Sequence, residues 1–131
     1  MGAVKAALHR ARTRLERAEA TPRRRQQLPA AQRALAQRYI AAFNARDWDG
    51  VRALLTDAAE LEVVQRYTGP FAGTRYLSNY ANNGWNWRLT LAWVDDVESI
   101  VTYREQRGTW TAHSIIQLDM ADDHIERIRD Y

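Results

Sequence analysis

The side chains best suited to proton transfer in this sequence are two histidines and three aspartates. They are His113, His124, Asp47, Asp119 and Asp130. His113 lies within an expected strand, on the face opposite Trp110, and would serve as a base or sensor if that face is concave; a structural histidine is the simpler alternative. Asp47 precedes an apolar helical run, so a helix cap explains it better. Asp130 follows Arg129, and an ion pair is its simplest role.

Several kinds of chemistry have no residues to carry them. There is no Ser-His-Asp set, no glycine-rich phosphate loop and no metal-spaced His/Asp cluster, so we expect no cofactor or metal and assign no catalytic residue. The chain has no cysteine, which excludes disulfides and is compatible with a reducing cytoplasm. No apolar run approaches the roughly 20 residues that cross a bilayer. We therefore expect a cytoplasmic protein without a membrane segment.

Aromatic side chains are abundant, with five Trp, six Tyr and two Phe in the chain. A cavity between helices and a curved sheet could be lined by such rings, with their polar ends hydrogen-bonded. A core or dimer-interface position is the simpler alternative for any single ring. The candidate ligand-pocket residues are Tyr39, Trp48, Tyr76, Tyr80, Trp87, Trp93, Tyr103 and His113.

Two amphipathic helices are expected to support this pocket. Between Ala30 and Leu55, apolar residues recur at helical spacing in two runs. Asn44 is suited to the end of the first helix, and Asp47 can cap the second. The pattern predicts a helical hairpin with one apolar side.

The remaining sequence changes from helical to strand periodicity. A first strand is expected at Glu60–Arg66, a turn at Tyr67–Gly73, and a short helix or irregular arm at Thr74–Asn83. Further strands are expected at residues 87–94, 97–104, 109–120 and 124–131. The sequence predicts an α+β fold in which helices pack on a curved antiparallel sheet.

The N-terminal segment differs from the rest in charge. Residues 1–30 contain eight basic and two acidic residues, a net +6, whereas residues 31–131 contain 11 basic and 14 acidic residues, a net −3. Helical spacing of apolar residues predicts a basic helix at 1–20, and Pro22 with the following arginines predicts a linker at 21–29. The main domain is expected at 30–131.

Residues 3–15 of the basic helix read AVKAALHRARTRL, with the specific core LHRAR. This run resembles the end of region 4 in extracytoplasmic-function (ECF) sigma factors of bacterial RNA polymerase. The resemblance implies a recognition helix that contacts promoter DNA. It also implies a longer protein, in which the first half of the helix-turn-helix and a polymerase-binding module precede this chain. A solvated basic helix is the alternative. Alone, the chain would bind DNA weakly. The implied DNA-binding residues are Lys5, His9, Arg10, Arg12 and Arg14.

The main domain contains two distinctive runs, AAFNARDWDGVRALL at residues 41–55 and IERIRDY at 125–131. These runs resemble SnoaL-like or NTF2-like domains, including those fused behind region 4 in some ECF sigma factors. The resemblance implies a cone-shaped fold. In the family the last strand usually continues past this motif, which implies that the chain is also short at its C-terminus.

Three functions remain open. The sequence favours a regulatory, non-enzymatic domain of an ECF sigma factor, with RNA polymerase and promoter DNA as partners of the full-length protein. The domain would then act by packing on the sigma modules or by sensing a small hydrophobic ligand. The second is a free-standing isomerase, cyclase or hydrolase acting on a small hydrophobic substrate. The third is a dimerisation scaffold, and a homodimer is expected.

Overall fold

The computed structural model describes residues 26–131. The expected basic helix at 1–20, with Lys5, His9, Arg10, Arg12 and Arg14, lies outside the described residues. Within them, three helices and six strands follow one another. These elements are α2 (Ala30–Asn44), α3 (Trp48–Ala53), β1 (Leu55–Val63), β2 (Tyr67–Pro70), α4 (Tyr76–Ala81), β3 (Trp87–Val94), β4 (Val97–Gln106), β5 (Thr109–Ala121) and β6 (His124–Asp130).

The two expected N-terminal helices are confirmed. α2 begins after Pro29 and ends at Asn44, and the chain then reverses through Arg46, whose φ is +61°. The predicted cap of α3 is present, because the Gly50 amide donates to Asp47 Oδ1 over 2.9 Å. The expected extent of this helix was wrong at its end, since α3 ends at Ala53 and Leu55 already belongs to β1.

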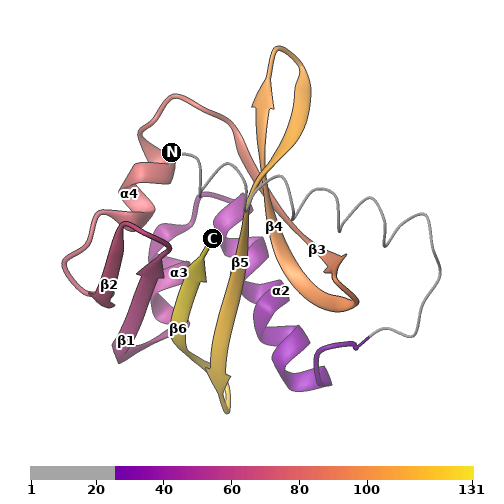
Figure 1. Ribbon diagram of the computed structural model, residues 1–131. Helices are drawn as coiled ribbons and strands as arrows, with labels where there is room; N and C mark the ends of the chain where they lie inside the picture. The colour runs from indigo at the N-terminus through magenta and orange to yellow at the C-terminus, as the bar shows by residue number, and fades with distance from the viewer. Residues whose placement is uncertain (1–25) are drawn as a thin grey trace.

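The six strands form one curved sheet in the order β2-β1-β6-β5-β4-β3 (Figure 1). Neighbouring strands are antiparallel except β1 and β6, which are parallel, with Leu61 opposite Ile128. The prediction of a wholly antiparallel sheet was therefore wrong at this one pair. Because β1 and β6 are the first and last strands in the chain, no local pattern indicates that they are neighbours.

The expected boundaries fit best where strand alternation is regular. β3 has the predicted bounds, and β4, β5 and β6 differ from theirs by no more than two residues. β1 begins at Leu55 rather than Glu60, with a register shift between these two residues. Tyr67–Pro70, expected as a turn, is the edge strand β2, where a proline is tolerated because one side of the strand has no partner.

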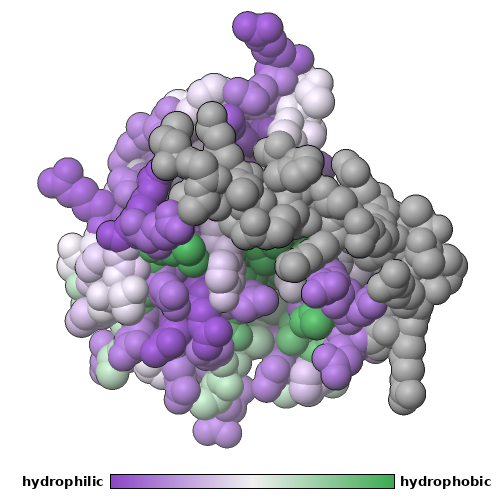
Figure 2. Space-filling view, viewed as in Figure 1, coloured by the Kyte–Doolittle hydropathy of each residue, from purple (hydrophilic) through white to green (hydrophobic). Residues whose placement is uncertain are grey.

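The core lies between the helices and one face of the sheet. In Figure 1, α2 and α3 lie behind the strands, and α4 lies near β2. On the face drawn in Figure 2, the described residues present mostly hydrophilic side chains, and hydrophobic ones show as small separate spots. The largest fully buried side chains are Tyr39, Phe43, Val51, Leu89, Val101, Thr102, Ile116, Ile125 and Ile128.

The described end of the predicted linker contacts the domain. The Gln26 amide donates to the Asp96 carbonyl over 2.8 Å, and the Glu98 amide donates to the Gln26 carbonyl over 3.2 Å. The Glu98 carboxylate, 6% exposed, accepts from the Leu28 amide over 3.2 Å and from Arg33 Nε over 3.1 Å. Residues 26–29 are thereby held against the start of β4.

No helix among residues 26–131 is both long and apolar enough to cross a membrane.

Candidate functional site

A cavity of about 710 Å³ opens between the sheet and α4. Residues from α4 and from all six strands line it, together with the segments that follow β1, β2 and α4. Its walls combine aromatic rings and aliphatic groups with a few polar side chains, which is typical of small-molecule sites. The polar and charged residues that line it include Arg66, Arg75, Asn79, Asn83, Arg104, His113, Ser114 and Asp130.

Among the described residues that line the cavity, Asp130 has the only acidic side chain. It is 7% exposed and comes from the last residue of β6. Tyr76 Oη donates to its Oδ2 over 2.8 Å, and Tyr80 Oη donates to the same oxygen over 2.6 Å. The two tyrosines are four residues apart on α4, so one face of this helix presents both hydroxyls to the carboxylate.

The tyrosines around Asp130 remain protonated donors. Burial raises the pKa of Tyr76 and of Tyr80 well above the ordinary value, and the negative charge of Asp130 raises both further. Burial and then Asp130 also raise the pKa of Tyr39, which lies behind the cavity in α2. Desolvation is the largest cause for all three groups, so these hydroxyls do not ionise near neutral pH, and those of Tyr76 and Tyr80 stay donors to Asp130.

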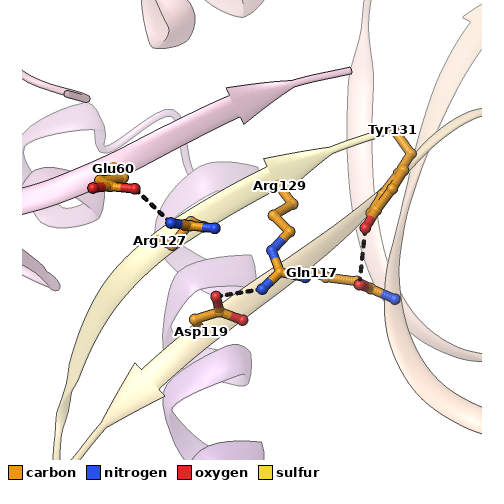
Figure 3. A network of polar contacts seen from close by, with 6 residues as sticks. All are labelled: Glu60, Gln117, Asp119, Arg127, Arg129 and Tyr131. Carbon is orange, nitrogen blue, oxygen red and sulfur yellow. Dashed lines mark hydrogen bonds and ion pairs between the residues drawn. The ribbon is translucent and has the colours of Figure 1, made fainter. Parts of the chain in front are cut away.

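The predicted ion pair between Asp130 and Arg129 was wrong. Adjacent residues of a strand point to opposite faces, and Arg129 pairs with Asp119 over 2.6 Å on the outer face (Figure 3). On that same face, Arg127 pairs with Glu60 over 2.6 Å. Asp130 instead shares the inner face with Ile128, and it is opposite Ile116 on β5.

A β-bulge brings His113 into the site. Thr102 is opposite Ser114 while Tyr103 is opposite Ala112, so His113 is an extra residue in β5. Regular alternation would send His113 and Ser114 to opposite faces, whereas both line the cavity. The bulge therefore adds a titratable side chain to the wall that holds Asp130.

Contacting aromatic rings form the wall between α4 and β5. Trp87 contacts Tyr80 with ring centroids 4.9 Å apart, and His113 with centroids 4.8 Å apart, both edge to face. Asn83 fixes Trp87 by accepting from its Nε1 over 3.0 Å, and the same oxygen accepts from the Trp85 amide over 2.9 Å.

Half of the residues expected in a pocket line this cavity: Tyr76, Tyr80, Trp87 and His113. Tyr39 is buried and Trp48 partly buried in the core, and Trp93 and Tyr103 are not among the lining residues. Sequence analysis considered Asp130 but assigned it to an ion pair, although its i, i+2 spacing from Ile128 indicates the inner face. Binding of a ligand by any of these residues stays a prediction.

Within residues 26–131, no group of three or more His, Asp or Glu side chains could hold a metal ion.

Comparison with solved structures identifies the fold. The chain resembles a candidate ketosteroid isomerase from Kribbella flavida with 24% identity over 76% of each chain and a TM-score of 0.56. It resembles a candidate polyketide cyclase from Xanthomonas campestris with 21% identity over 77% of this chain and 89% of the other, and a TM-score of 0.52. The fold is NTF2-like.

A third neighbour carries this name: an NTF2-like protein from Cytophaga hutchinsonii has 12% identity over 76% of this chain and 87% of the other, and a TM-score of 0.54. No protein-family model and no curated protein matches the chain. The expected fold class is therefore confirmed, as helices packed on a curved, open, mixed sheet. At these identities the likeness extends to the fold and not to the activity.

Proposed function

We propose that the cavity binds a compact, largely apolar, ring-containing molecule and that Asp130 transfers a proton on it. The observation that carries this proposal is the buried Asp130 carboxylate, held by two tyrosine hydroxyls at the wall of a cavity of about 710 Å³. A buried carboxylate in a largely apolar cleft is a typical acid–base group. Two neighbours named as a candidate isomerase and a candidate cyclase fit this reaction class.

In this proposal, Asp130 removes a proton from a carbon next to a carbonyl group. The electrons of the broken C–H bond pass into the carbonyl and form an enolate, and Asp130 then returns the proton to another atom of the molecule. Both tyrosines donate to Oδ2, so Oδ1 is the oxygen that would take the proton. His113 lines the same cavity and would donate a hydrogen bond to the enolate oxygen.

Proton exchange on a simple ketone tests this function. The C1 protons of 2-tetralone exchange with D₂O when a base removes them, and loss of their NMR signal gives the rate. We expect the protein to accelerate this exchange over buffer, and Asp130→Asn to reduce the acceleration about 100-fold or more, because general-base catalysis typically contributes about 10²–10⁴-fold.

A matched carboxylate on the opposite face provides the control. Asp119→Asn removes the partner of Arg129 outside the cavity and is expected to leave the exchange rate unchanged. Urea unfolding of both variants checks that they are folded. Exchange no faster than in buffer, or equal acceleration by the wild type and Asp130→Asn, would contradict the proposed acid–base function.

We also propose, as a second candidate, that the chain is a regulatory part of an ECF sigma factor whose cavity senses a ligand. The LHRAR core at residues 8–12 and the net +6 of residues 1–30 support this candidate. Its partners would be RNA polymerase and promoter DNA. Immunoprecipitation of the native protein from its source cells should then recover RNA polymerase subunits, and their absence would count against it.

A further inference from the structure

The cavity has an uneven distribution of charge. Besides Asp130, the charged side chains among the described lining residues are three arginines, which come from three separate parts of the chain. Arg66 follows β1, Arg75 immediately precedes α4, and Arg104 lies on β4. Asp130 is buried, whereas Arg66 and Arg75 are exposed and Arg104 is partly exposed. The buried wall is therefore negative, and the outer part of the cavity is positive.

Of the eleven arginines within residues 26–131, four pair with a carboxylate and seven, including the three that line the cavity, do not. Arg33 and Arg129 each pair with a carboxylate, as do Arg52 and Arg127. Within residues 26–131, no carboxylate pairs with any of the three lining arginines. Guanidinium groups with unused donors are suited to bind a carboxylate, because their planar geometry allows two parallel hydrogen bonds.

One of the three arginines is fixed by an aromatic ring. The Arg104 guanidinium carbon lies 4.4 Å from the centroid of the Trp85 ring, and Trp85 also lines the cavity with 42% of its surface exposed. Stacking uses the face of the guanidinium and leaves the N–H groups at its edge available. The arrangement thus holds a cation in place while keeping its hydrogen-bond donors free for a ligand.

We propose that these arginines bind the carboxylate of a ligand whose ring system occupies the apolar walls and whose uncharged end reaches Asp130. This rests on the proposed function and adds the substrate class, namely a ring-containing ketone that bears a carboxylate at the end far from the reacting carbon. Repulsion from Asp130 disfavours the reversed orientation, so the two charges together fix which end of the ligand is deprotonated.

A pair of probes that differ only in charge tests this inference. 2-Naphthoate and 2-naphthamide have nearly the same shape, and quenching of tryptophan fluorescence reports their binding at low salt. We expect naphthoate to bind about tenfold or more tightly, because a hydrogen bond to a charged group contributes about that factor. The preference should fall as salt is raised, since the arginines are near solvent.

Substitution locates the anion-binding groups. In Arg66→Gln/Arg75→Gln and in Arg104→Gln, the preference for naphthoate should fall at least threefold, while the affinity for naphthamide changes less. Arg88→Gln is a matched control, because Arg88 also lies over a tryptophan, 4.9 Å from the Trp110 ring centroid, but does not line the cavity. Arg88→Gln should keep the full preference.

The outcomes separate this inference from the proposed function. If both probes bind equally, or the preference survives both sets of arginine substitutions, the carboxylate site is wrong. Exchange of 2-tetralone protons that depends on Asp130 would still support the acid–base function in that case. If neither probe binds at millimolar concentration, the anion site and the ring-binding cavity are both overturned.

Discussion

At the scale of single residues, the Asp130 carboxylate depends on two hydroxyl groups. Tyr76→Phe and Tyr80→Phe each remove one donor to Oδ2 and leave the ring in place. We expect each variant to lower the free energy of unfolding by about 1.5–3 kcal/mol, as for other hydrogen bonds to charged groups. The double variant should lose more than both single losses together, because it leaves the buried carboxylate without either donor.

Urea unfolding measures these changes, and an exposed tyrosine gives the control. Tyr67 Oη donates to the Pro70 carbonyl over 2.7 Å at the edge of the sheet, where water can replace it. Tyr67→Phe should change the free energy of unfolding by less than about 0.5 kcal/mol. Equal losses of unfolding free energy in Tyr67→Phe and Tyr80→Phe would show that the hydrogen bond to Asp130 stabilises the protein no more than an exposed one does.

Buried tyrosines also predict how stability depends on pH. Burial and the charge of Asp130 raise the pKa of Tyr39, Tyr76 and Tyr80 above the ordinary value of 10.0. Above about pH 10 the unfolded chain loses protons that the folded protein keeps, so the free energy of unfolding is fully retained below that pH and falls above it. The expected slope is about −1.4 kcal/mol per pH unit for each tyrosine.

Urea midpoints between pH 8 and 11.5 test this dependence. Tyr80→Phe should reduce the slope above pH 10 by about 1.4 kcal/mol per pH unit, the amount that belongs to one tyrosine. A free energy of unfolding that does not decrease between pH 10 and 11.5 would contradict the raised pKa values.

At the scale of elements, one side chain joins α2 to β3. Asn44 Nδ2 donates to the Leu89 carbonyl over 2.9 Å, and the Leu89 amide donates to Asn44 Oδ1 over 2.8 Å. β3 is an edge strand, so the asparagine amide satisfies backbone groups that have no neighbouring strand. Asn44→Leu should cost about 1–3 kcal/mol of unfolding free energy, because a partly buried donor and acceptor lose their partner.

Two further variants sharpen this test by urea unfolding. Asn44→Asp keeps the acceptor for the Leu89 amide but replaces the donor with a charged oxygen beside the Leu89 carbonyl, so it should also destabilise. Gln37→Ala, at an exposed position of α2, should change the free energy by less than about 0.5 kcal/mol. A neutral effect of Asn44→Leu would mean that water satisfies Leu89 equally well.

Helices and strands whose periodicity lies within a single segment of the chain could be predicted from the sequence. β3 to β6 show alternation within single strands, and α2 and α3 show helical spacing with Asp47 as a cap. β2 could not be predicted, because four residues that include Gly69 and Pro70 form a strand only by pairing with β1. The parallel contact of β1 with β6 joins the first and last strands, and it depends on the closure of the whole sheet.

At the scale of the whole molecule, the site was only partly predictable. An aromatic pocket follows from composition, and Tyr76 and Tyr80 follow from helical spacing. Their bonds to Asp130 span 54 and 50 residues of sequence, so no local pattern reports them. His113 faces the cavity through a bulge, which depends on the register of β5 against β4. Pairing across the sheet, rather than any motif, brings these side chains together at the cavity.

The separation of charge along the chain predicts where DNA would bind. Residues 1–30 carry a net +6 and residues 31–131 a net −3, so the groups that neutralise phosphates should lie in the N-terminal segment. Residues 1–30 are called the basic arm below. Replacing its basic residues with neutral ones should weaken binding of the full chain to duplex DNA, and should lower the log–log slope of affinity against salt by about 0.9 for each phosphate that the variant no longer neutralises. The arm variant replaces Lys5, Arg10, Arg12 and Arg14 with Gln.

A second variant with the same change in net charge separates the arm from the overall charge. The body variant replaces Arg38, Arg52, Arg88 and Arg107, all exposed, with Gln. Fluorescence anisotropy of labelled duplex DNA from 20 to 200 mM salt compares the two variants. If DNA binds to the arm, the arm variant should lose more affinity than the body variant, and its affinity should depend less steeply on salt concentration. Equal losses would mean that the DNA responds only to net charge, which would remove the support that the basic segment lends to a sigma-factor function.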